Sequence, residues 1–269
     1  MPDSHLEDVA PAPRSNARET FAAFVDQATA DPAVVGLVLK GSQSHANVPT
    51  RHSDYDLYVV IADDGDTALS RLAGFRSAHL DLVVLSLSEF RTVGLPASSE
   101  SWERYAFVHA EVLLDRRDGL IAELVERKAK LTADEARRIA GDYLDAYINS
   151  LYRSLKNHRD GFADAAHLDA TESIPFLLTT VFALDRRVRP YNKYLRWELE
   201  RQPLSSPLWA ADRLLPRLRE LIAAGDPDLQ RELFAEVEAV ARAQGHGAVI
   251  DAWGADLLLL RGPAGGDLQ

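Results

Sequence analysis

The chain has 269 residues, carries a formal net charge of -11 and contains no cysteine. Its 46% hydrophobic residues can form a sizeable core, which excludes a disordered or collagen-like chain, and the lack of cysteine excludes a disulfide scaffold, a cysteine-ligated zinc site and a catalytic thiol. The acidic charge makes the chain as a whole a poor ligand for nucleic acid or anionic lipid, but it permits a local basic site for a small phosphorylated ligand.

The two ends of the chain do not look like folded segments. Residues 1–14 are polar and contain prolines, with no apolar stretch of the kind found in signal peptides, and residues 263–269 are rich in glycine. We therefore predict flexible tails over 1–14 and 263–269. The longest apolar runs, such as Leu257–Leu260, are too short to cross a bilayer. A cytoplasmic protein without membrane contact is expected.

The first half of the chain alternates helix and strand patterns, with short β-branched runs separated by turns. The predicted elements, in order, are a helix over 15–30, a strand over 34–39, a strand over 55–61, a short helix over 67–76, a strand over 80–85, a short helix capped by Ser86 or Ser88, a strand over 105–114 and a helix over 120–130.

The second half is almost entirely helical in pattern. Thr132-Ala-Asp-Glu135 has the form of a capping box and begins a helix that reaches about residue 158. Further helices are predicted over 163–185, from Pro190 onward, and over 207–223, 227–243 and 249–260. Strands followed by helices indicate an α+β fold, with an N-terminal mixed-sheet domain over 15–130 and a C-terminal helical bundle over 131–262.

Two acids stand at the start of the second predicted strand. Side chains alternate faces along a strand, so Asp54 and Asp56 point the same way with Tyr58 behind them, while Leu57 points toward a core. Two carboxylates on one face repel each other unless both are solvated or a cation lies between them. Among cations, Mg²⁺ has the strongest preference for such oxygen ligands.

A third acid, Asp81, lies within the apolar run of the next predicted strand, where a charge needs a partner. If this strand pairs beside that of Asp56, three carboxylates converge, which is enough to hold two metal ions. Gly41-Ser42 ends the preceding strand. A glycine there lets backbone amides approach a phosphate closely, and the serine hydroxyl adds a donor.

The order Gly41-Ser42, a polar loop, Ser53-Asp54-Tyr55-Asp56-Leu57 and an acid on a later strand resembles the polymerase-β-like nucleotidyltransferase superfamily, over residues 33–86. The helical second half looks like the C-terminal bundle of bacterial antibiotic nucleotidyltransferases of the aminoglycoside and lincosamide type. Within it, Arg189-Pro190-Tyr191-Asn192-Lys193-Tyr194-Leu195 resembles a segment of family members that carry this bundle. The motifs are specific for the superfamily but do not identify a substrate.

One departure from the family pattern concerns the loop after Gly41-Ser42. Family members commonly have a second glycine there, as in Gly-Ser-x-Ala-Arg-Gly, whereas Gln43-Ser44-His45-Ala46-Asn47 has neither glycine nor arginine. We expect a different path for this loop. Arg51 and His52 are candidates for supplying the missing positive or donor groups.

The resemblance implies a reaction and a set of roles. Asp54 and Asp56 hold Mg²⁺ on the triphosphate of an NTP, with two ions expected and ATP the first candidate, and Asp81 either ligates the second ion or acts as a base. Attack by a hydroxyl group at the α-phosphorus releases pyrophosphate. The implied nucleotide-binding residues are Gly41, Ser42, Ser53, Arg51 and Lys193, the last within a stretch over 186–196 that has five basic residues and no acid.

Other interpretations of these residues stay open. The acid pair could be surface acids, Asp81 a structural acid paired with an arginine, Ser42 a plain turn residue, and the basic stretch a solvated helix end. Glu103 and Glu172 are candidates for an acceptor pocket, with the surface interpretation favoured for Glu103. Tyr191 and Tyr194 are expected to pack rather than to stack on a base.

Three functions remain in competition. The first is nucleotidyl transfer to a hydroxyl group of a small molecule, with antibiotics among the candidate acceptors. The acidic net charge supports this function. The second is transfer to a macromolecule, a tRNA or a protein, which the basic stretch supports. The third is an inactive nucleotide-binding module, against which the complete set of acids argues. The pattern is silent on oligomeric state.

Overall fold

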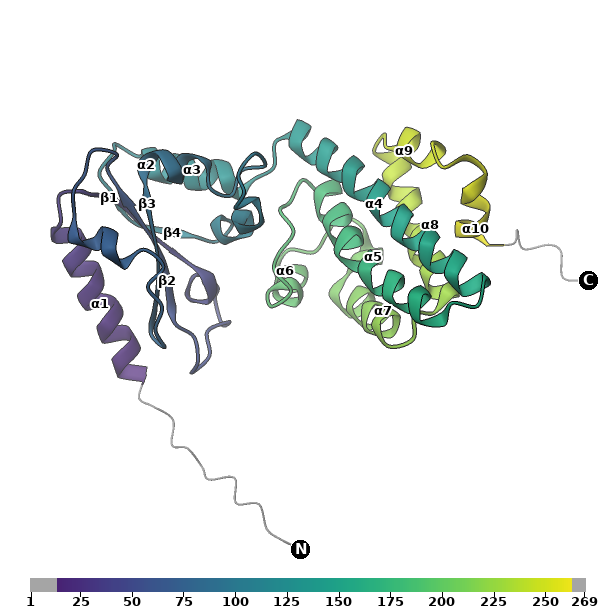
Figure 1. Cartoon of the computed structure of the whole chain (residues 1–269), viewed down its shortest axis with the longest axis horizontal. Helices are drawn as coiled ribbons and strands as arrows, with labels where there is room; N and C mark the ends of the chain where they lie inside the picture. Colours follow the sequence, from purple (N-terminus) through teal and green to yellow (C-terminus); the bar gives the residue numbers. More distant parts are fainter. Residues whose placement is uncertain (1–13, 263–269) are drawn as a thin grey trace, which may run out of the picture. The chain divides into compact units, whose positions relative to one another are not determined.

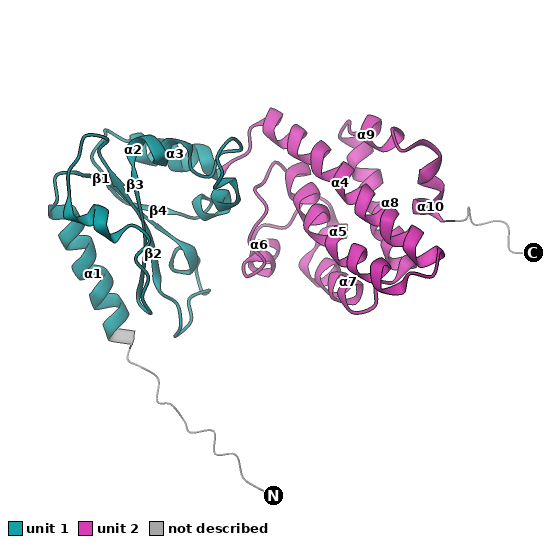
Figure 2. Ribbon diagram, viewed as in Figure 1, with its two compact units in different colours: residues 1–129 teal, residues 130–269 magenta. Residues whose placement is uncertain are grey.

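The computed structural model describes residues 14–262 and contains two compact units, with the division between Ala129 and Lys130 (Figures 1 and 2). The first unit contains a mixed sheet and the second contains only helices, so the predicted α+β class is confirmed. The predicted tails lie outside the described residues, apart from Arg14, with which the first helix begins.

The sheet of the first unit has four strands in the order β3-β2-β1-β4. Strand β1 (Val34–Lys40) runs antiparallel to both β2 (Tyr55–Ile61) and β4 (Glu111–Asp115), whereas β3 (Leu80–Ser86) runs parallel to β2. The three strands predicted from β-branched runs are present, each within one residue of its expected bounds. The end of β1 and the start of β2 therefore lie at the same edge of the sheet, where the motif residues are.

Both faces of the sheet are covered. Helix α1 (Arg14–Ala30) and the 3-10 turn η2 (Ala68–Leu72) pack on one face; α2 (Leu87–Thr92), the 3-10 segment η3 (Ser101–Phe107) and α3 (Leu120–Ala129) cover the other. Tyr58 was expected behind the acids, opposite the core, but it is fully buried, stacked on Phe107 at 5.1 Å between ring centroids. Near-continuous apolar strands such as β1 and β2 are typically buried on both faces.

Two predicted elements of the first unit differ from the structure. The expected strand over 105–114 begins only at Glu111, because Tyr105 belongs to η3, whose hydrogen bonds turn the chain back before β4. The expected helix over 67–76 is a single 3-10 turn, capped by the Thr67 hydroxyl. Ser86, in contrast, caps α2 as expected, in a reciprocal bond with Glu89.

The second unit has its core along α4 (Ala133–Arg159) and α5 (Ala163–Leu184), which lie side by side (Figure 1). The capping box of Thr132 and Glu135 begins α4 as predicted. The remaining helices are α6 (Leu195–Arg201), α7 (Ala211–Ala224), α8 (Pro227–Ala243), α9 (Gly247–Asp251) and α10 (Leu257–Arg261), with 3-10 turns η4 (Pro207–Trp209) and η5 (Gly254–Asp256).

Three helix predictions in this unit were wrong at their bounds. The helix expected over 207–223 begins only at Ala211, because residues 207–209 form the separate 3-10 turn η4. Pro190 does not begin a helix: Asn192 accepts a bond from Arg189, Tyr194 closes a turn onto Tyr191, and α6 starts only at Leu195. The helix expected over 249–260 is broken at Gly254, whose φ of +52° is not helical. None of the helices between residues 14 and 262 combines the length and apolar character that crossing a bilayer requires.

Candidate metal centre

Three carboxylates meet at the edge of the sheet where β2 begins. Asp56 and Asp81 are directly opposite in the parallel pairing of β2 and β3, so both side chains leave the sheet on the same face. Asp54 precedes β2 by one residue, and each of the three acids offers an oxygen within 4.8 Å of those of the other two. The structure thus brings together the three acids that the sequence singled out.

The environment of Asp81 favours a cation. Its Oδ1 atom is buried and has no hydrogen-bond partner among the described residues, while its Oδ2 atom lies 3.3 Å from Nε of Arg76. The Arg76 side chain is 80% exposed, and an exposed ion pair contributes little. The interpretation of Asp81 as a structural acid paired with an arginine therefore accounts for only one of its oxygens. A buried carboxylate oxygen without a partner is costly, and a bound cation would satisfy it.

Gly41 brings the chain against this acid cluster. It begins the 3-10 turn η1 (Gly41–Ser44) with φ +72°, in the left-handed region that favours glycine. A Cβ atom at this position would lie 2.8 Å from the Asp56 carboxyl carbon, well inside van der Waals contact. The absence of a side chain lets the backbone lie directly on Asp56. Ser42 follows, buried at 3% exposure.

These features together fit a divalent cation. Three carboxylates supply only oxygen ligands and three negative charges, which is the donor set that Mg²⁺ prefers. The unpaired Asp81 oxygen gives such an ion a ligand, and the Gly41 backbone lies directly against Asp56. Asp54, Asp56 and Asp81 are the residues that would hold it.

The loop after η1 contains a residue other than glycine with a positive φ. Asn47 adopts φ +63°, which lies in the left-handed region. Asn is among the few residues other than glycine that tolerate this region, and that tolerance was the available signal. The loop is held further by His45, which is buried at 4% exposure.

The remaining nucleotide-binding candidates of the first unit lie in the turn before β2. Nε of Arg51 donates to Nε2 of His52 at 3.0 Å, and both side chains are exposed. The Ser53 hydroxyl accepts a bond from the Thr50 amide at 2.9 Å, and its carbonyl accepts one from Gln43 of η1 at 3.5 Å. Ser53 therefore ties the turn to η1, and the contacts of Arg51 and Ser53 with a nucleotide stay predictions.

A second charged group lies on the acid-bearing face. Lys40 is the register partner of Asp56 in β1, and its Nζ lies 3.8 Å from Glu103 Oε2 and 4.5 Å from the centre of the Tyr58 ring. The Tyr58 hydroxyl also donates to Glu103. The Glu103 side chain is only 12% exposed, so the favoured surface interpretation of this residue was wrong. Its burial comes from η3, which replaces the strand expected there.

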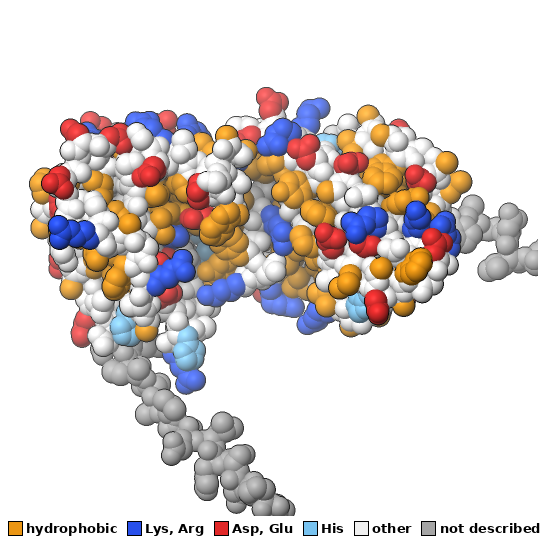
Figure 3. Space-filling view, viewed as in Figure 1, with side chains coloured by type: hydrophobic (Ala, Val, Ile, Leu, Met, Phe, Trp, Pro, Cys, Tyr) orange, Lys and Arg blue, Asp and Glu red, His pale blue; other side chains and the backbone are white. Residues whose placement is uncertain are grey.

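The basic stretch over 186–196 belongs to the second unit and is partly neutralised. Arg187 pairs with Glu198 at 2.7 Å and Arg196 with Glu200 at 3.0 Å, both acids contributed by α6. On the face of the second unit that Figure 3 shows, side chains of both signs of charge occur. Lys193 is exposed, with its Nζ 5.4 Å from the Tyr194 ring.

The other second-unit candidates agree with their plainer interpretations. Tyr194 is buried at 6% exposure, as expected for a packing residue, and its ring lies 6.4 Å from that of Tyr191. Glu172 is 53% exposed and lies 3.9 Å from Arg153, which also binds the buried Asp169 at 2.7 Å. Glu172 is therefore a surface acid in an ion-pair network.

No protein-family model matches this chain, and no curated protein matches it significantly. Among solved structures, the chain is similar to a nucleotidyltransferase-like protein from Exiguobacterium sibiricum 255-15, with 13% sequence identity and a TM-score of 0.36. The match covers 88% of this chain and 79% of that one. The functional assignment accordingly depends on the residues of the site.

Proposed function

We propose that the protein transfers a nucleoside monophosphate from an NTP, ATP being the first candidate, to a hydroxyl group of a small acceptor molecule, in a magnesium-dependent reaction. The observation that supports this most directly is the group of three carboxylates, Asp54, Asp56 and Asp81, with oxygens within 4.8 Å of one another. The Gly41-Ser42 turn, whose backbone lies against Asp56, is beside this group.

The chemistry divides among a few groups. The acceptor oxygen forms a bond to the α-phosphorus, the bond from that phosphorus to the bridging oxygen breaks, and pyrophosphate leaves with the bridging oxygen. Magnesium, when bound, supplies positive charge that offsets the phosphates and the acids. Asp54 and Asp56 would hold this ion, and the ion would bind the triphosphate end of the nucleotide. The acceptor proton passes to a carboxylate, and the unpaired Oδ1 of Asp81 suits that role or a metal ligand.

The nature of the acceptor follows from charge. A net charge of -11 opposes a polynucleotide acceptor and favours a small or cationic one. The basic stretch, which supported a tRNA or protein acceptor, loses part of its field to Glu198 and Glu200. Transfer to a macromolecule is therefore the second candidate. An antibiotic is one class of small hydroxyl compound, and no contact in the described residues selects it over others.

The decisive experiment incubates the protein with each labelled NTP and Mg²⁺ against a panel of hydroxyl compounds and measures pyrophosphate release. We expect turnover that the double variant Asp54→Asn, Asp56→Asn abolishes, while the exposed Asp66→Asn retains it. Persistent turnover in the double variant would refute the site. If calorimetry finds no magnesium-dependent binding of any NTP, both enzymatic functions fail. Binding of tRNA that weakens steeply with salt would favour the macromolecular acceptor.

A further inference from the structure

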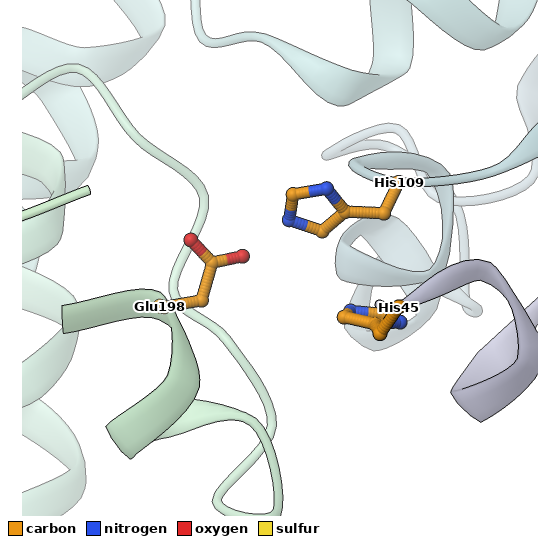
Figure 4. A group of neighbouring side chains, drawn as sticks. All are labelled: His45, His109 and Glu198. Carbon is orange, nitrogen blue, oxygen red and sulfur yellow. The ribbon is translucent and has the colours of Figure 1, made fainter. Parts of the chain in front are cut away.

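The ring of His45 links the glycine turn to η3. Its Nδ1 lies 2.7 Å from the Gly41 carbonyl oxygen and its Nε2 3.1 Å from the Tyr105 hydroxyl. Because a carbonyl oxygen can only accept, Nδ1 carries a proton and donates to Gly41, while Nε2 shares a hydrogen bond with the tyrosine hydroxyl. The ring of His109 lies beside it, with 4.7 Å between ring centroids (Figure 4).

Two side chains act on one carbonyl group of the turn. The Ser44 hydroxyl donates to the same Gly41 oxygen at 2.8 Å, so this carbonyl is held from two directions. No peptide bond among the described residues is cis. In a trans peptide the carbonyl oxygen of one residue and the amide hydrogen of the next point in opposite directions. Holding the Gly41 carbonyl therefore fixes the direction of the Ser42 N–H.

The other end of the link is held by several hydrogen bonds. Three consecutive residues of η3 bind three different elements: Glu103 accepts from Tyr58 of β2, Arg104 Nε donates to the Lys128 carbonyl of α3 at 3.0 Å, and Tyr105 bonds to His45. Tyr105 is 2% exposed. The His45 imidazole is thus hydrogen-bonded to η3, which is itself hydrogen-bonded to strand β2 and helix α3.

We propose that His45 is a positioning residue for the phosphates of the nucleotide: it aims the Ser42 amide, at the head of the turn that lies on Asp56, toward a phosphate oxygen. The inference rests on the proposed function and adds a residue to its phosphate-binding part. His45 holds the turn at the Gly41 carbonyl, and Asn47, two residues further on, adopts a left-handed φ of +63°.

Variants that remove the two bonds of the ring separately test this role. His45→Ala loses both, His45→Asn keeps a donor at the position of Nδ1, and Tyr105→Phe loses only the hydroxyl. We expect His45→Ala to raise the dissociation constant for the magnesium complex of a non-hydrolysable ATP analogue about tenfold, the size of one hydrogen bond. His45→Asn and Tyr105→Phe are expected to cost less and, when combined, to add little to each other.

Two readouts separate positioning from general damage to the fold. Inorganic tripolyphosphate should lose affinity by the same factor as the ATP analogue, while circular dichroism at the assay temperature shows the variant to be folded. Added imidazole should restore binding in His45→Ala but do nothing for a control, His158→Ala, whose residue is exposed at the end of α4. If wild type binds the analogue and His45→Ala binds it equally well, the positioning role is refuted and the proposed function stands. If wild type binds no NTP with Mg²⁺, the proposed function itself fails.

Discussion

The Asp56 carboxylate occupies the space that a side chain at position 41 would need. A Cβ atom built on Gly41 lies 2.8 Å from the Asp56 carboxyl carbon. The two residues come from the facing ends of β1 and β2, where the antiparallel pairing places Lys40 opposite Asp56. The Asp56 carboxylate, a candidate metal ligand, can therefore keep its position only if residue 41 is a glycine.

Gly41→Ala therefore disturbs the acid cluster as well as the backbone. We expect it to lower the affinity for Mg²⁺ and to abolish nucleotide binding, because Asp56 must move away from the added methyl group. The matched control is Gly74→Ala, since Gly74 has φ +73° but open space around its Cβ position. Both substitutions carry a left-handed strain of about 1 kcal/mol. Calorimetric titration with Mg²⁺ checks the difference, and equal effects of the two variants would contradict it.

The charges of Lys40 and Glu103 should change the electrostatic potential at Asp54, Asp56 and Asp81 in opposite directions. Both side chains are mostly buried, at 15% and 12% exposure, on the face that carries Asp56. Lys40→Met should raise the Mg²⁺ affinity about threefold and Glu103→Gln lower it about threefold, as expected for charges at this range in a partly screened site. Titrations at low and high salt measure this, and both differences should shrink as salt increases. Changes of the same sign in the two variants would refute the electrostatic origin.

A pH dependence of stability is expected from Lys128. Its ammonium group is buried between the rings of Phe90 and Phe107, at 4.0 and 4.4 Å, and donates to the Phe90 carbonyl. Burial, with the nearby Arg127 charge, lowers the pKa of Lys128 from 10.5 to about 7. Between pH 7 and pH 10.5, Lys128 is protonated in the unfolded chain but neutral in the folded one. The free energy of unfolding therefore rises with pH in this range, and below it Lys128 adds no pH dependence.

The contribution of Lys128 to this change in the free energy of unfolding is at most about 5 kcal/mol, at about 1.4 kcal/mol per pKa unit. Urea unfolding at several pH values from 6 to about 10 measures the slope. Lys128→Met should remove most of it, whereas Lys156→Met, at an exposed position of α4, should leave it unchanged. An equal slope in Lys128→Met and wild type would show that the ammonium group is not the source.

Lys193 is the residue of the 186–196 stretch that the sequence predicts to bind the nucleotide. Its exposed ammonium group forms no ion pair with an acid of residues 14–262. Arg196, in contrast, forms an ion pair with Glu200 at 3.0 Å. Lys193→Ala should weaken binding of ATP with Mg²⁺ up to about tenfold and flatten its salt dependence. Arg196→Ala serves as the control with a smaller effect. Identical binding curves for Lys193→Ala and wild type would remove Lys193 from the site.

The strands and the acids were predictable because both depend on short-range patterns. The apolar runs at β1, β2 and β3 allowed few alternatives, and alternation along β2 placed Asp54 and Asp56 on one face. The convergence of Asp81 required only that β3 lie beside β2. These parts of the site follow from residue type and spacing.

The remaining contacts depend on partners that are distant in sequence. Glu103 looked like a surface acid because nothing near it in the chain indicates that Tyr58 and Lys40 surround it. Tyr105 was assigned to a strand for its β-propensity, yet its bond to His45 comes from a 3-10 segment. Long-range side-chain bonds override local propensity here, and a single sequence does not encode them visibly.

The 3-10 segment η3 carries an implication for how this chain tolerates changes in length. Its residues Glu103, Arg104 and Tyr105 each bind a different element, and a 3-10 helix turns by about 120° per residue. Deleting or inserting one residue between Ser101 and Glu103 would rotate all three side chains to the wrong neighbours at once. Any functional relative of this chain should therefore keep the register of this segment, and place its insertions elsewhere.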